Sequence, residues 1–71
     1  MKHQFTAILE QGDKLLVATC PEVPEAHGQG ETRKDALDDL AGSIQSVLEY
    51  RREEALSKLG AGSERTVVEV A

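Results

Sequence analysis

Three residues carry side chains that commonly bind zinc or take part in nucleophilic catalysis: His3, Cys20 and His27. No two of them have the spacing of a zinc site and no fourth ligand is evident, so we expect no metal. Cys20 and His27 could instead pair as nucleophile and base, with a nearby glutamate orienting the ring. Cys20, however, is expected on the core face of a strand, where a thiol is shielded and unreactive. The pattern therefore predicts no catalytic residues and a protein that is not an enzyme.

Acidic residues are concentrated in the predicted turns and at the start of a predicted helix. Metal-assisted catalysis would need several carboxylates to converge from strand ends and from the helix. A solvated rim explains the acids in turns and loops better, and Asp35 and Asp39 stabilise the positive end of the helix dipole. We expect no metal or cofactor site among them. The turn and loop acids are Glu10, Asp13, Glu22, Glu25 and Glu31.

Two further motifs are weak signals for a ligand. Gly28-Gln29-Gly30 resembles the start of a phosphate-binding loop, but the remaining glycine and the lysine are missing, and Glu31 would repel phosphate. We predict that these glycines give the backbone freedom to adopt an unusual conformation before the helix. The pair Arg51-Arg52 is flanked by glutamates on both sides, a pattern typical of salt bridges along a helix face.

The elements that must position these residues begin with a β-hairpin. Two short apolar runs, residues 5–10 and 14–20, flank Gly12-Asp13, which we predict as the central pair of a tight primed turn. In this register Leu9 pairs with Leu16, and one face of the hairpin is apolar while the other is mixed. The predicted core face holds Phe5, Ala7, Leu9, Leu16, Ala18 and Cys20, and the apolar residues of the mixed face are Ile8, Leu15 and Val17.

A long helix is predicted after the hairpin. Residues 21–24 end the second strand because they begin and end with proline, and residues 26–31 fit either a third strand or a loop. Thr32 has the position of an N-cap. Apolar residues then recur every three or four positions through residues 33–59, a length of about 40 Å for an unbroken helix. Strands of about 17–20 Å cannot cover such a helix, so it either stops near residues 50–52 or extends beyond the sheet.

The last predicted strand is residues 65–70, a β-branched run that follows a Gly-Ala-Gly-Ser loop. Together these elements predict one α+β domain over residues 1–71. Its expected architecture is a small antiparallel sheet with one long helix packed on one face, in the order β-β-β-α-β.

The composition narrows the class of partner. The 71 residues include 8 Lys and Arg against 13 Asp and Glu, a net charge of -5, which disfavours binding to nucleic-acid phosphates. An aromatic content of 3% leaves few platforms for stacked bases. No run approaches the roughly 18 apolar residues of a membrane span, and the N-terminus lacks the apolar run of a signal peptide. We therefore expect a cytoplasmic protein, a compartment that suits an unpaired thiol.

Small size makes self-association an expected property. The core of so short a chain is marginal, and a single cysteine excludes an internal disulfide. The mixed face of the hairpin is also too apolar to lie entirely in water. We therefore predict a homo-oligomer whose contact face includes Ile8, Leu15 and Val17.

Motifs in a fixed order identify a resemblance to a known family. The hairpin is followed by Cys20-Pro21-Glu22-Val23-Pro24, then by Gly28-Gln29-Gly30-Glu31-Thr32, then by Asp35-Ala36-Leu37 on the helix. This pattern resembles the HicB-like antitoxin family over residues 4–50 and, more weakly, over the last strand. The resemblance implies a partial RNase H-like fold without catalysis. It also implies an antitoxin that binds and masks a small basic HicA-type mRNA interferase. Full-length members add a C-terminal DNA-binding domain, for which this chain has no room, so we expect no direct nucleic-acid binding by this chain alone.

Occlusion of a basic toxin is favoured by a surface of opposite charge. Residues 1–31 hold two lysines against five acids, although solubility alone also explains this imbalance. Under the resemblance, we expect Glu22, Glu25 and Glu31 to form part of the toxin-binding rim. The alternative is an orphan self-associating structural module that has no toxin partner.

Overall fold

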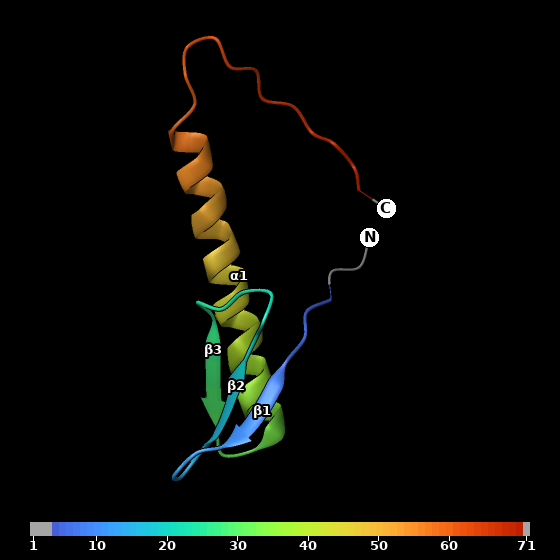
Figure 1. The fold of residues 1–71 in the computed structure, drawn as a ribbon, viewed down its shortest axis with the longest axis vertical. Helices are drawn as coiled ribbons and strands as arrows, with labels where there is room; N and C mark the ends of the chain where they lie inside the picture. The colour runs from blue at the N-terminus through green and yellow to red at the C-terminus, as the bar shows by residue number, and fades with distance from the viewer. Residues whose placement is uncertain (1–3, 71) are drawn as a thin grey trace.

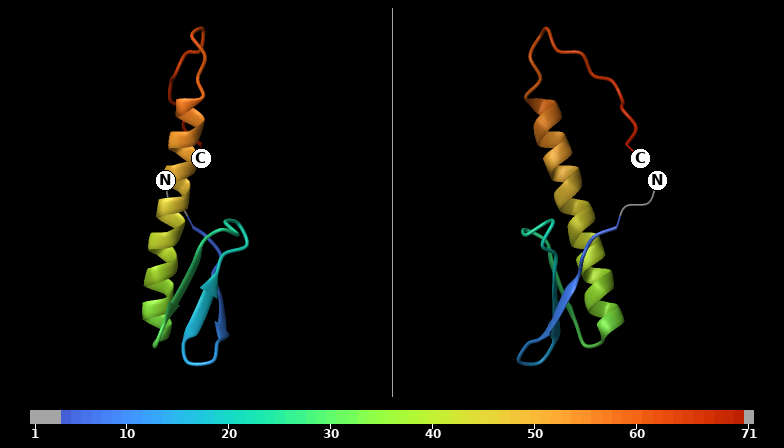
Figure 2. Two further views of the ribbon diagram at one scale, coloured as in Figure 1. Left: turned by 90° about the vertical axis from the view of Figure 1, so that its left-hand side faces the viewer. Right: turned by 45° about the vertical axis from the view of Figure 1, so that its right-hand side comes forward.

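The computed structural model describes residues 4–70, which form a sheet and one helix. The elements are β1 (Ile8–Gln11), β2 (Leu16–Thr19), β3 (His27–Gly30) and α1 (Arg33–Ser57). The sheet is antiparallel in the order β1-β2-β3. Helix α1 forms a second layer on one face of the sheet, chiefly over β3 (Figures 1 and 2). The predicted α+β class is confirmed, and residues 26–31 contain a strand rather than only a loop.

The hairpin register differs by two residues from the predicted one. Leu9 pairs with Ala18 instead of Leu16. The connection is Gly12–Leu15, in which the N–H of the first residue donates to the carbonyl of the last at 2.8 Å. The predicted primed turn is wrong, because no described residue has a positive φ. A shift of two residues nevertheless keeps every side chain on its predicted face, since side chains alternate along a strand.

The core between the sheet and the helix is small and aliphatic. Its largest fully buried side chains are Val23 and Cys20. Two successive turns fold Val23 beneath the helix: its N–H donates to the Cys20 carbonyl at 3.2 Å, and its own carbonyl accepts from the Ala26 N–H at 3.0 Å. The predicted core positions Phe5 and Ala7 are exposed, because α1 covers β2 and β3 more than β1. The buried hydrophobic residues of the described chain are Ala18, Cys20, Val23, Ala26, Ala36, Leu40 and Ile44.

The glycines of β3 allow the helix to lie directly on the strand. A Cβ atom on Gly28 would lie 2.4 Å from the backbone nitrogen of Leu40 and 2.6 Å from the carbonyl oxygen of Ala36. A Cβ atom on Gly30 would lie 2.7 Å from the backbone nitrogen of Ala36. Neither glycine has a positive φ. The prediction that they provide an unusual backbone conformation is therefore wrong, and close packing is what requires them.

Helix α1 is continuous and extends beyond the sheet (Figure 1). Thr32 is the N-cap, as predicted, and its hydroxyl accepts from the Asp35 N–H at 3.1 Å. The 25 residues of α1 span about 37 Å, and the longest dimension of the molecule is 52 Å. No helix within residues 4–70 combines the length and the apolar character that a membrane crossing requires.

The prediction of a last strand at residues 65–70 is wrong for the single chain. The segment runs apart from the sheet (Figure 1), and Val67, Val68 and Val70 are 89%, 82% and 64% exposed. It leaves the far end of α1 through a turn in which the Ser63 N–H donates to the Gly60 carbonyl at 3.1 Å. A β-branched run favours a strand only when a neighbouring strand is present. The described elements therefore have the order β-β-β-α.

Candidate functional site

Glu22, predicted as part of an acidic rim, is bound to the segment before β1. Its carboxylate accepts from the Thr6 N–H at 3.0 and 3.1 Å and from the Thr6 hydroxyl at 2.7 Å. The Cys20 thiol donates to the same carboxylate at 3.4 Å. These contacts lower the pKa of Glu22 from 4.5 to about 2. The hydrogen bond from the Thr6 hydroxyl has the largest effect, followed by those from the N–H groups of Glu22 and Thr6. The carboxylate is therefore ionised at neutral pH but already has partners within the chain.

Glu25 is also paired within the chain. Arg51 reaches from α1 to form an ion pair with it, and the two side chains remain 44% and 53% exposed. Arg51 lowers the pKa of Glu25 by donating a hydrogen bond, and its positive charge has a smaller effect in the same direction. The flanking glutamates suggested that Arg51 would pair along the helix, but it pairs with a residue 26 positions earlier. The ion pair connects α1 to the turn between β2 and β3.

The three candidate carboxylates do not form one cluster. Glu22 and Glu25 lie in the turn before β3, whereas Glu31 follows the end of that strand. Glu31 is exposed and is followed at once by the first turns of α1, which also carry acids. Asp38 in these turns is paired with Lys34 at 2.6 Å. Of the three candidate carboxylates, Glu31 is the one for which the described residues provide no ion pair or side-chain hydrogen bond.

A polar groove lies between β3 and α1. At the edge of the sheet, the Gln29 N–H donates to the Asp39 carboxylate at 3.0 Å and the His27 N–H donates to the Ser43 hydroxyl at 3.2 Å. These contacts occupy the outward N–H groups of β3, which would otherwise be available to another strand. Asp39 thus has a specific structural partner in addition to the helix dipole. The groove lining includes His27, Gln29, Asp38, Asp39, Ser43 and Ser46.

The edge of β1 has no such protection. The bond between the Gly12 N–H and the Leu15 carbonyl sets the alternation of the ladder, so Leu9 and Gln11 direct their backbone groups outward. Within residues 4–70, no side-chain or loop hydrogen bond uses the N–H of either residue. The described sheet therefore has one blocked edge and one open edge.

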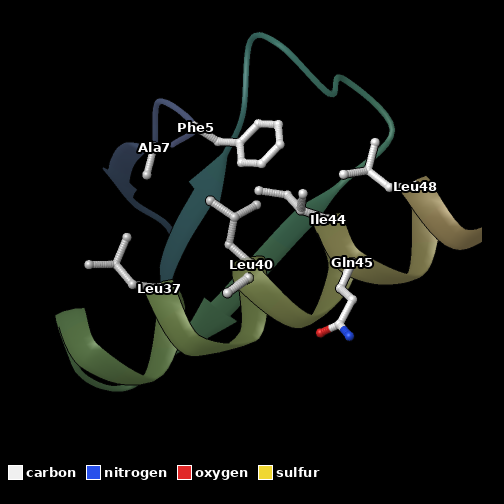
Figure 3. Close-up of a pocket in the computed structure, with 8 residues that line it drawn as sticks. Phe5, Ala7, Leu37, Leu40, Ile44, Gln45 and Leu48 are labelled. Atoms are coloured by element: carbon white, nitrogen blue, oxygen red, sulfur yellow. The ribbon is translucent and has the colours of Figure 1, made fainter. Parts of the chain in front are cut away.

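An apolar groove of about 460 Å³ lies between the β1 side of the sheet and α1 (Figure 3). Phe5 points over the helix toward Ile44, while the Gln45 side chain points away from Phe5 (Figure 3). Sequence reasoning missed this groove, although the apolar stripe of the helix is wide enough to indicate it. One row of the stripe, Ala36-Leu40-Ile44, faces the sheet, and the adjacent row contributes to the groove. The groove is lined by Phe5, Ala7, Leu37, Leu40, Ala41, Ile44, Gln45 and Leu48.

The other predicted positions are separated by the sheet. Cys20 is 1% exposed on the helix side, whereas the pairing of His27 with Thr19 places the histidine on the opposite face. The structure therefore does not bring the proposed nucleophile and base together. Within residues 4–70, no three His, Cys, Asp or Glu side chains group as a metal site. His3 lies outside the described residues.

The predicted oligomer face lies on the sheet surface away from α1. Ile8 is 44% exposed, and Leu15 and Val17 are half-buried. Leu15 belongs to the hairpin connection rather than to β2, so the three residues are less continuous than the sequence register suggested. Their contact with another copy stays a prediction.

One comparison with known proteins gives a relative. The chain is 44% identical over 55 residues to the UPF0150 protein ssl0738 of Synechocystis sp., and the aligned part covers 76% of each chain. No protein-family model matches the chain, and no solved structure matches it.

Proposed function

We propose that this chain, which belongs to the UPF0150 protein family, is an antitoxin-like binding protein. It neutralises a small basic toxin of the HicA type, an mRNA interferase, by occluding it. In this proposal the chain is cytoplasmic, self-associates, has no catalytic activity and requires no cofactor. The relation to the partial RNase H-like fold belongs to the same proposal.

The arrangement of charge is the observation that carries this proposal. On the side of the molecule formed by β3 and the start of α1, Asp38 and Asp39 line the polar groove and Glu31 is exposed before the helix begins. Asp38 also forms an ion pair with Lys34 at 2.6 Å. The β1 side presents the apolar groove instead. A protein surface that collects acids on one side attracts a basic partner and increases its rate of association. We therefore assign the toxin to the acidic side, defined by Glu31, Asp38 and Asp39.

The sequence motifs provide the second support. The Cys-Pro-Glu-Val-Pro motif forms the turn that buries Val23 and contains Glu22, and the Gly-Glu-Thr motif leads into the capped start of α1. Glu22 and Glu25 stay in the proposal as part of the negative field, because both are exposed and both have a lowered pKa. Their internal partners reduce the contribution that either makes to a toxin contact.

Co-expression tests this function. The chain is produced with the product of the adjacent reading frame, and co-purification and relief of growth arrest are measured. We expect both with the natural sequence. The double variant Glu31→Lys and Asp38→Lys should lose relief, whereas Glu53→Lys with Glu64→Lys, which changes the net charge equally at the far end, should retain it.

The possible results separate the two candidate functions. If a folded natural chain neither co-purifies with that product nor relieves arrest, the toxin proposal is wrong. Self-association without any such binding would then favour the orphan structural module. Equal loss of relief in both charge variants would contradict the assignment to the acidic side.

A further inference from the structure

The outer edge of β3 has occupied donors and free acceptors. The N–H groups of His27 and Gln29 bond to Ser43 and Asp39 of α1, so the backbone groups of both strand residues point away from β2. Within residues 4–70, no turn, loop or side-chain hydrogen bond ends on the carbonyl of either residue. The main chain at this edge therefore accepts hydrogen bonds but has no outward donor left in the strand.

This combination excludes one class of partner. A strand that joins a sheet edge must both donate to it and accept from it, because each outward residue offers an N–H beside a carbonyl. At β3 the carbonyl groups of an added strand would face N–H groups that already have partners. The edge is thus unsuited to the addition of a partner strand, but it suits side chains that only donate.

The polar groove beside this edge supplies further acceptors. It has a volume of about 590 Å³, and none of the described residues that line it is a lysine or an arginine. Asp39 uses one carboxylate oxygen for the Gln29 N–H, and its other oxygen can accept as well. Asp38 pairs with Lys34, but the two side chains are 66% and 83% exposed, so a competing cation displaces Lys34 at little cost. The groove therefore presents carbonyl and carboxylate oxygens to a ligand.

Arginine is the side chain whose chemistry fits these acceptors. Its guanidinium group carries several N–H donors in a planar fork and has no acceptor. One arginine can thus bond a carbonyl of β3 and a carboxylate of α1 at the same time. Lysine has the same charge, but its donors all lie on one nitrogen atom and cannot form such a fork.

We propose that the polar groove binds arginine side chains of a basic protein through the free carbonyls of β3 and two aspartates of α1. The inference rests on the proposed function, which identifies that protein as the toxin, and it adds the mode of contact. Side chains dock against a strand edge that a partner strand cannot join. The accepting groups are the carbonyls of His27 and Gln29 and the carboxylates of Asp38 and Asp39.

A titration with short peptides tests the groove without any toxin. Acetylated and amidated tetra-arginine is added to the isotope-labelled full chain, and the carbonyl carbon shifts are followed by NMR. We expect the signals of His27 and Gln29 to move as their carbonyls accept hydrogen bonds, whereas that of Gly28, which faces β2, should stay in place. Tetra-lysine carries the same charge, and we expect it to bind about threefold more weakly.

Charge variants of the chain separate the groove from the overall negative charge. Asp38→Asn removes one carboxylate from the groove, and we expect it to weaken the binding of tetra-arginine about threefold. Glu53→Gln removes the same charge from the far part of α1 and should bind the peptide like the natural chain. Both residues are exposed, so each variant should keep the fold.

Several results would overturn the groove as an arginine site. They are no binding at millimolar peptide, binding that leaves the carbonyl signals of His27 and Gln29 in place, and shifts concentrated at the open edge of β1. Equal affinity for the two peptides would contradict the choice of arginine. Equal weakening by Asp38→Asn and Glu53→Gln would reduce the contact to net charge.

The peptide result and the toxin result are separable. A toxin that co-purifies with the chain although the peptides fail to bind the groove would support the proposed function and reject this mode of contact. Peptides that bind the groove of a chain that neither co-purifies with the toxin nor relieves growth arrest would support the groove and reject the proposed function.

Discussion

At the level of single residues, the carboxylate of Glu22 connects the segment before β1 to the turn after β2. The register places Thr6 opposite Pro21, which has no N–H and ends the ladder. Beyond the end of the ladder, the Glu22 carboxylate accepts hydrogen bonds from both the N–H and the hydroxyl of Thr6. A residue that we assigned to partner binding therefore also has a role in holding the fold together.

This role predicts a pH dependence of stability. The folded pKa of Glu22 is about 2, below its ordinary value of 4.5. A lowered pKa means that the stabilisation is fully present above about pH 5 and is lost as the pH falls toward 2. We expect Glu22→Gln to lower the free energy of unfolding at neutral pH and to approach the natural chain below about pH 3. Urea denaturation across this range measures the difference, which Glu53→Gln should not reproduce. A gap of constant size at every pH would contradict the role.

Alanine substitution at two glycines should change stability in opposite directions, because the surroundings of the two residues differ. A Cβ on Gly28 meets the backbone of α1, so Gly28→Ala should force the helix away and cost about 1–3 kcal/mol. Gly42 has nothing within 4 Å of its added Cβ. Gly42→Ala should therefore stabilise the helix by about 0.5–1 kcal/mol. Thermal or urea unfolding of both variants checks the signs, and destabilisation by both would show that close packing at Gly28 is not the reason for the glycine.

At the level of elements, the edge of β3 depends on two side chains of α1. Replacing Asp39 with alanine should remove the acceptor of the Gln29 N–H and cost about 1 kcal/mol. The amide hydrogen of Gln29 should then exchange faster, whereas that of Gly28, which faces β2, should change less. Asp39→Asn keeps a side-chain oxygen and serves as the matched control. Unchanged exchange at Gln29 in the alanine variant would contradict this account of the blocked edge.

The elements were predictable to the extent that their patterns are local. The start of α1 follows from Thr32 and the acids after it, and the two faces of the hairpin follow from alternation, which a register shift of two leaves intact. The closing hydrogen bond of Gly12–Leu15 decided the register, and sequence alone did not indicate it. The strand predicted at residues 65–70 failed because a strand requires a neighbour that the helix end does not provide.

The candidate surfaces were less predictable because they depend on long-range packing. Nothing in the neighbourhood of Arg51 identifies Glu25 as its partner, and nothing around Asp39 identifies the Gln29 N–H. The position of α1 over β3 decides both contacts. It also leaves Phe5 exposed at the groove instead of buried in the core.

At the level of the whole molecule, the fold separates two kinds of surface. The β3 side is acidic and its strand edge is occupied, whereas the β1 side is apolar and its strand edge is open. This separation allows one chain to bind a basic partner and a second copy at once.

The most direct test of the proposed function is a titration of RNA cleavage. The purified product of the adjacent reading frame is mixed with increasing amounts of this chain, and the initial rate of mRNA cleavage is followed. Occlusion predicts a rate that falls linearly and reaches zero at a fixed molar ratio, with the masses of both proteins unchanged. An undiminished rate at a large excess of the folded chain would contradict it.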